Sequence, residues 1–117
     1  MMDFLFRERS AAIVVPEKIL QVIIFPDNGE YTAYCPQFDL ATSQATPEDV
    51  LKDIIYAIEE YIEDYMNSFN IYSKSPNRAG HSSLIQKAKE ARSRWELREL
   101  IEVRYGEIYI RPVQKSA

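Results

Sequence analysis

The sequence predicts one α+β domain, an antiparallel β-meander packed on an amphipathic helix, with a C-terminal helix and β-hairpin. Three observations predict this class. Apolar and alternating segments separated by turn residues fill 18–45, helical periodicity fills 47–66, and 117 residues suffice for one hydrophobic core. The expected organisation is a single domain over 1–117, with a core at 18–66, a loop at 67–81 and an extension at 82–117.

The meander is expected to contain three strands. Residues 18–25 are apolar at both parities, which predicts a central strand covered on both faces. Residues 26–29, Pro-Asp-Asn-Gly, have the composition of a tight turn. Residues 30–35 alternate in polarity, which predicts a half-exposed strand that Pro36 ends. Residues 38–45 predict a weaker strand at an edge of the sheet.

The start of the long helix is the clearest local signal in the chain. Thr46 suits the N-cap, and Pro47 suits the first helical position. Two acids follow, where they complement the positive end of the helix dipole. Over 47–66 the apolar residues lie on one stripe, which predicts a helix that packs against the sheet.

The segment after this helix is expected to begin as a loop. Residues 67–81 carry Ser, Asn, Pro and Gly at intervals, a composition typical of a long loop. Ser83 and Gln86 then match a capping box, which predicts a second helix ending at Trp95. The apolar residues of that helix, Trp95 included, recur at helical spacing and predict a packed stripe.

The two ends of the chain offer weaker patterns. Residues 101–105 and 108–110 alternate in polarity on either side of Gly106, which predicts a C-terminal hairpin. Residues 11–15 suit a short edge strand.

The formal net charge of −4 conceals an acidic middle and a basic end. Residues 48–64 hold seven acids and one base, whereas residues 74–115 hold ten bases and five acids. A protein that grips nucleic acid with one dominant basic face would have a high isoelectric point, and this chain does not.

The acidic face of the helix is the main candidate binding site. Glu59 and Glu63 are like charges one turn apart, a spacing that costs about 0.2–0.5 kcal/mol per pair. A basic partner would relieve this repulsion and be steered toward it. Tyr56 stands among the acids and suits an interface anchor. The candidate partner-binding residues are Asp49, Asp53, Tyr56, Glu59, Glu60 and Glu63.

Two other interpretations of the charge pattern stay open. In the first, the acidic face is solvated or pairs with the chain's own basic segment, in a stand-alone oligomeric domain. In the second, the basic segment binds nucleic acid weakly, with Arg78 contributing. The residues for either contact are Lys87, Lys89, Arg92, Arg94 and Arg98.

Catalytic chemistry has little support in the sequence. A two-metal nuclease needs several carboxylates, and the central strand carries none. Cys35 is expected to be a small buried thiol and His81 a solvated loop residue. No phosphate loop, catalytic triad or metal-finger spacing occurs. We therefore expect no enzyme, no metal and no cofactor.

The composition, 46% apolar and 27% charged, is that of a globular protein. The longest apolar runs are of about five residues, where a membrane span needs about 20. The apolar residues 4–6 are followed at once by charged residues 7–9, which does not match a signal peptide. We expect a cytoplasmic location and no contact with a membrane.

The segment 28–36, Asn-Gly-Glu-Tyr-Thr-Ala-Tyr-Cys-Pro, resembles the second strand of the HicB-like antitoxins, and Thr-Pro-Glu-Asp-Val-Leu at 46–51 extends the resemblance. It covers about 18–66. The resemblance implies a HicB-like partial RNase H fold, assembly into a homodimer or homotetramer, and a small basic HicA-like toxin whose RNA cleavage is blocked. Many members add a DNA-binding tail. Residues 82–117 match neither a helix-turn-helix nor a ribbon-helix-helix, so we expect no operator binding by this chain.

Overall fold

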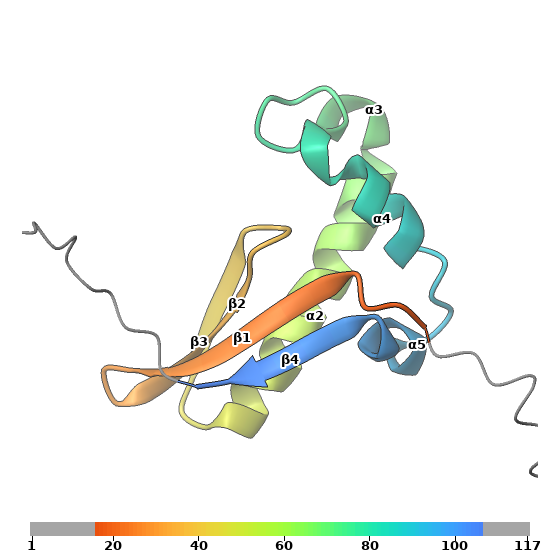
Figure 1. Ribbon diagram of the computed structural model, residues 1–117. Coiled ribbons are helices and arrows are strands. Elements are labelled where there is room, and N and C mark those ends of the chain that lie inside the picture. The colour runs from red at the N-terminus through yellow and green to blue at the C-terminus, as the bar shows by residue number, and fades with distance from the viewer. Residues whose placement is uncertain (1–15, 107–117) are drawn as a thin grey trace, which may run out of the picture.

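The computed structural model describes residues 16–106, which form a four-stranded sheet and a set of helices (Figure 1). The strand order is β3-β2-β1-β4. The strands are β1 (Leu20–Asp27), β2 (Glu30–Cys35), β3 (Leu40–Gln44) and β4 (Ile101–Tyr105). The predicted α+β class is therefore confirmed.

The first three strands form the expected antiparallel meander. Asn28 and Gly29 make the tight turn between β1 and β2, and both have positive φ, 52° and 84°. Such a turn matches the twist of a hairpin and suits Asn-Gly. The strand β1 runs on through Pro26 and Asp27, so the turn is shorter than the predicted 26–29. The strand β3 lies at the edge of the sheet, as predicted.

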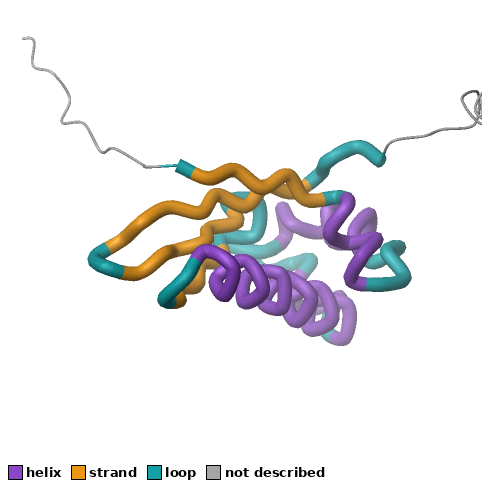
Figure 2. The backbone as a smooth tube through the Cα atoms, turned by 90° about the horizontal axis from the view of Figure 1, so that it is seen from below, coloured by secondary structure: helices purple, strands orange, loops and turns teal. Residues whose placement is uncertain are grey.

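The central strand β1 is covered on one face only. Leu20, Val22 and Ile24 are at most 1% exposed, whereas Ile23 and Phe25 on the other face are half-buried. The helices gather on one side of the strands (Figure 2). The central position is thus confirmed, but the predicted cover on both faces is wrong for residues 16–106, because no helix there lies on the second face.

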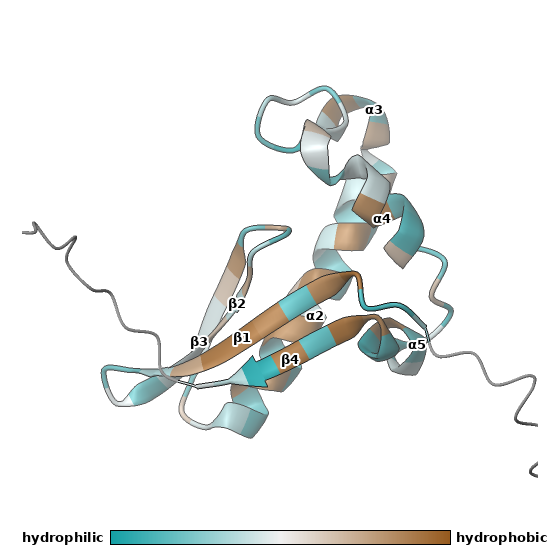
Figure 3. Cartoon of the chain, viewed as in Figure 1, coloured by the Kyte–Doolittle hydropathy of each residue, from teal (hydrophilic) through white to brown (hydrophobic). Residues whose placement is uncertain are grey.

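The helix α2 (Pro47–Asn67) covers the inner face of the sheet. Its start is as predicted, since the Thr46 side chain accepts a hydrogen bond from the Asp49 amide at 3.1 Å. The side chains of Val50, Ile54 and Ile58 are fully buried. Hydrophobic bands of α2 face those of β1 and β4 across the core (Figure 3). The helix period and the strand alternation therefore meet in one core.

The strand β4 forms the other edge of the sheet and pairs with β1, which is far from it in the sequence. It runs parallel to β1, with Leu20 opposite Ile101 and Val22 opposite Val103. The predicted strand at 101–105 is confirmed, but its partner in the described residues is β1. The second strand of the predicted hairpin, 108–110, and the suggested strand at 11–15 lie outside the described residues.

The prediction of an irregular loop over 67–81 is wrong. The segment contains a one-turn helix, α3 (Phe69–Tyr72), and a 3-10 turn, η1 (Ala79–His81). The rings of Phe69 and Tyr72 pack on Tyr65 of α2, with ring centroids 5.8 and 5.3 Å apart. Aromatic contacts thus order a segment whose composition suggested a loop.

The prediction of one helix over 83–95 is also wrong. Two short helices occur instead, α4 (Ser82–Ala88) and α5 (Arg94–Glu99). The expected capping box at Ser83 is absent, because Ser83 lies inside α4. A different serine, Ser93, caps α5 by accepting a hydrogen bond from the Glu96 amide at 3.1 Å. The break turns Leu97 into the core and leaves Trp95 73% exposed.

We expect Ile58→Ala to lower the free energy of unfolding by about 2–5 kcal/mol, because it removes a fully buried side chain between α2 and the sheet. Urea denaturation measures the change. The control is Lys52→Ala, at an exposed position of the same helix, which should stay within about 0.5 kcal/mol of the wild type. Equal losses in the two variants would contradict the assigned face of α2.

Candidate functional site

The polar side of α2 is the candidate surface. Of the five acids among the predicted partner-binding residues, four make no ion pair within residues 16–106. Asp49, Glu60 and Glu63 are exposed. Asp53 is half-buried and accepts a hydrogen bond from Gln44 at 3.1 Å. Tyr56 is 53% exposed. These residues therefore form one accessible acidic face with an aromatic side chain in it.

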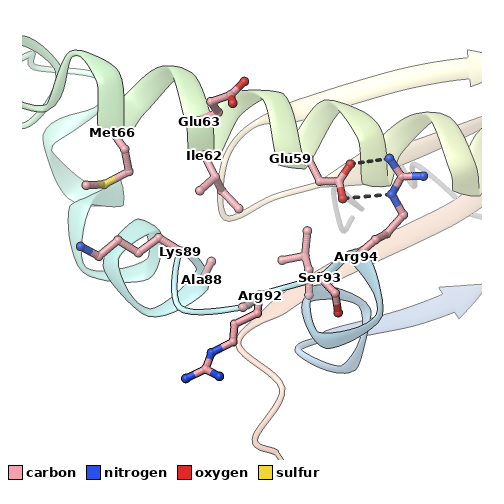
Figure 4. Close-up of a pocket in the computed structure, with 11 residues that line it drawn as sticks. Glu59, Ile62, Glu63, Met66, Ala88, Lys89, Arg92, Ser93 and Arg94 are labelled. Atoms are coloured by element: carbon pink, nitrogen blue, oxygen red, sulfur yellow. Dashed lines mark hydrogen bonds and ion pairs between the residues drawn. The ribbon is translucent and has the colours of Figure 1, made fainter.

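Glu59, the sixth predicted residue, makes a contact within the chain. Its carboxylate accepts two hydrogen bonds from the Arg94 guanidinium of α5, at 2.9 and 3.0 Å (Figure 4). This bidentate geometry is the strongest form of the pair. The Glu59 carboxylate, through these bonds and its charge, raises the pKa of Arg94. One interpretation of the charge pattern was that the acidic helix pairs with the chain's own basic segment. Glu59 and Arg94 make such a contact.

The other acids of α2 make no ion pair with the basic segment within residues 16–106. Between residues 16 and 106 the ion pairs are Glu59 with Arg94 and Glu102 with Arg104. Figure 4 shows the Lys89 and Arg92 side chains extending away from α2, and Glu63 pointing away from them. Most of the acidic face is therefore left for another molecule.

A pocket of about 430 Å³ lies beside the Glu59–Arg94 pair, between α2 and the connection from α4 to α5 (Figure 4). Ile62, Met66 and Leu97 contribute apolar lining. Charged residues of opposite sign line its two sides, acids from α2 and bases from the connection. The ion pair therefore joins two helices across one end of a mixed apolar and charged groove.

The basic residues do not form the continuous helical face that the sequence predicts. Lys87 lies on α4, Lys89 and Arg92 lie in the connection, and Arg98 is half-buried on α5. The helix break separates them. Arg78 stacks on Tyr61 and Tyr72 instead, with its guanidinium carbon 5.3 and 5.0 Å from the ring centroids. The described residues therefore contain no contiguous basic helix of the kind that the nucleic-acid interpretation requires.

The sequence analysis missed an aromatic cluster at the C-terminal end of α2. The Tyr61 hydroxyl lies 2.6 Å from Nδ1 of His81, and the Phe38 ring lies 5.1 Å from that of Tyr61. The prediction of a solvated His81 is wrong, because this ring is half-buried among aromatic side chains. Burial, and then the charge of Arg78, lower the pKa of His81. The spacing of Tyr61 and Tyr65 predicts that they lie on the packed face of the helix. It does not predict that the segment around His81 packs on them.

The prediction of a small buried thiol is confirmed. Cys35 is 0% exposed, and burial raises the pKa of its thiol, which disfavours the reactive thiolate. Residues 16–106 contain no group of three or more His, Cys, Asp or Glu side chains arranged to hold a metal ion. No helix in this part of the chain is long and apolar enough to cross a bilayer.

Comparisons with known proteins point to one class. A PHD-like family model, described as the antitoxin of RelE/RelB toxin-antitoxin systems, matches residues 18–103. The crystal structure of an antitoxin part of a proposed toxin/antitoxin system from Syntrophomonas wolfei subsp. wolfei has a TM-score of 0.64 and 24% identity. The match covers 74% of this chain and 63% of that one, and it shows the fold alone. Among curated proteins, none matches.

The comparisons confirm the coarser part of the family resemblance and leave the finer part open. The family match is to antitoxins, the class that the motifs at 28–36 and 46–51 imply. Neither match singles out the HicB-like family or a partial RNase H fold.

We expect Cys35 to react with Ellman's reagent far more slowly in the folded protein than in guanidinium, because burial hides the sulfur and raises its pKa. Absorbance of the released thiolate follows the reaction. The unfolded protein, with its single cysteine, is the control and should release one equivalent. Equally fast reaction of the folded protein would contradict the burial of this strand.

Stability should fall as pH drops through about 6.5, the usual pKa of histidine. The folded state lowers the pKa of His81, so the unfolded chain binds the proton more readily and gains from acid. The stabilisation is present above that pH and is lost as pH falls toward the folded pKa. Urea midpoints between pH 7.5 and 5 measure it.

The control for this pH dependence is His81→Gln, which removes the only histidine. Its stability should decline less over the same range, since the carboxylates are the same in both proteins. Parallel declines in the two proteins would show that His81 does not contribute.

Proposed function

The chain belongs to the family of antitoxins of RelE/RelB toxin-antitoxin systems, and on that premise we propose that it neutralises a toxin by direct protein–protein contact. The observation that carries the proposal is the exposed acidic face of α2. Four of its five predicted acids make no ion pair within residues 16–106. The partner that fits this face is a small, basic, RNA-cleaving toxin of the HicA-like kind.

The charge of such a toxin follows from its chemistry. A protein that holds RNA contacts phosphates with clustered Lys and Arg side chains. An acidic helix presents carboxylates to the same cluster, so it attracts the toxin from a distance and then covers the surface that RNA would use. The antitoxin acts in this proposal by occlusion, without catalysis, in the cytoplasm where RNA is the toxin's substrate.

The finer family assignment is part of the same proposal. The meander, the helix that begins at Thr46 and the motif at 28–36 support a HicB-like antitoxin with a partial RNase H fold. The proposal includes assembly into a homodimer or homotetramer, for which the open face of the sheet offers half-buried apolar residues.

A second candidate is a stand-alone oligomeric domain whose acidic face meets its own basic segment. The Glu59–Arg94 pair favours it. The remaining acids weigh against it, because Asp49, Glu60 and Glu63 stay exposed.

The test is co-expression with the small basic protein encoded next to this chain. We expect that protein to arrest growth alone and the wild-type chain to restore growth. The triple variant Asp53→Lys, Glu60→Lys and Glu63→Lys should fail to restore growth and bind at least about tenfold more weakly, because like charges now meet. Growth and titration calorimetry are the measurements.

The control is the triple Glu17→Lys, Glu30→Lys and Glu90→Lys, which makes the same charge change at exposed positions away from α2. It should behave as the wild type. Circular dichroism verifies that both variants fold. If both triples bind alike, the interface lies elsewhere, and if no neighbouring basic protein is toxic, the antitoxin role itself is wrong.

A further inference from the structure

Trp95 is a large apolar side chain that the break between α4 and α5 leaves exposed. It is the only tryptophan of the chain, and 73% of it is exposed, on the helix α5. Tyr56 on α2 is 53% exposed. Exposed large aromatic side chains mark interfaces, and Trp and Tyr dominate the binding energy of interfaces that have been mapped.

Each of the two aromatic residues is close in the sequence to one member of an ion pair. Tyr56 lies one helical turn before Glu59, and Trp95 directly follows Arg94. The bidentate pair of Glu59 and Arg94 joins their helices at 2.9 Å. Because residues three apart on a helix lie on neighbouring positions of its surface, Tyr56 is next to Glu59 on α2.

The surface around Tyr56 selects the charge of an occupant. Asp53 and Glu60 lie one turn to either side of Tyr56 on α2, and Glu63 follows on the same helix. A guanidinium can pair with such carboxylates while stacking on an aromatic ring. The chain shows this stacking itself, where Arg78 lies over the rings of Tyr61 and Tyr72.

We propose that Tyr56 and Trp95, carried by the two helices that the Glu59–Arg94 pair joins, form the aromatic centre of the surface that binds a basic segment of the toxin. This inference rests on the proposed function and extends its surface from α2 to α5. An arginine of the toxin stacks on Tyr56 between the acids, and the indole of Trp95 covers an apolar part of the same segment.

The fluorescence of Trp95 can show whether a partner covers this side chain. In the free chain its fluorescence should be that of a water-exposed indole, and it should be quenched readily by acrylamide. Addition of the small basic protein from the co-expression test should shift the emission to shorter wavelength and reduce the quenching. Unchanged emission on a complex that forms would overturn the proposal.

Mutation gives the second measurement. Trp95→Ala and Tyr56→Ala should each weaken the complex by about 30-fold or more, the range of interface hot spots. The matched control is Ile71→Ala, which removes a large apolar side chain that is 67% exposed on α3. It should leave the affinity unchanged.

The outcomes separate this inference from the proposed function. If the wild type binds and both aromatic variants match the Ile71→Ala control, the acidic face binds without an aromatic centre and only this inference falls. If the wild type does not bind, both fall. If the free chain already shows a shielded indole that becomes exposed on dilution, a second copy of the chain is the occupant and the proposal is wrong.

Discussion

The apolar stripe of α2 is the constraint on which the rest of the molecule depends. Its first half, with Val50 and Ile54, lies on the inner face of the sheet. Its second half, with Ile62 and Tyr65, runs past the sheet and requires another cover (Figure 1). The segments α3, η1 and α4 supply it, because leaving a stripe of that size in water would cost about 25 cal/mol for each Å² of apolar surface. The C-terminal half of the chain is therefore folded around a helix that the N-terminal half positions.

The same constraint decides which surface of α2 remains available. With the sheet and the later helices on the apolar stripe, the acidic side is the part of α2 that solvent reaches. One acid on its border, Glu59, meets Arg94 and ties α5 to α2. The ion pair is exposed on the arginine side, so its role is to orient the helices more than to stabilise the fold. The candidate surface is thus a consequence of packing on the opposite side of the helix.

The features that the sequence predicts well are those that neighbouring residues determine. Thr46 caps α2 through an amide three residues away, and Asn28 and Gly29 form a turn by their own backbone preferences. The pairing of β4 with β1 joins residues 81 positions apart, such as Gln21 and Glu102, and no local pattern encodes it. The cluster around His81 was missed for the same reason, since its other rings, Phe38 and Tyr61, lie far from it in the sequence. Of the candidate site, the acids and a set of basic residues that includes Arg94 were predictable, but which acid pairs with which base was not.

The break between α4 and α5 shows that tertiary packing decides which of two similar N-capping sequences starts a helix. Ser83 with Gln86 and Ser93 with Glu96 match the same capping pattern. A helix started by the first would continue through 95 and place Trp95 on the stripe of Ala88. A helix started by the second buries Leu97 and brings Ile101 into register beside Leu20, which extends the core across a fourth strand. The second helix start buries Leu97 in place of the larger indole, so the pairing of β4 with β1 is accompanied by an exposed Trp95. A bound partner that covers the indole would remove its apolar surface from water.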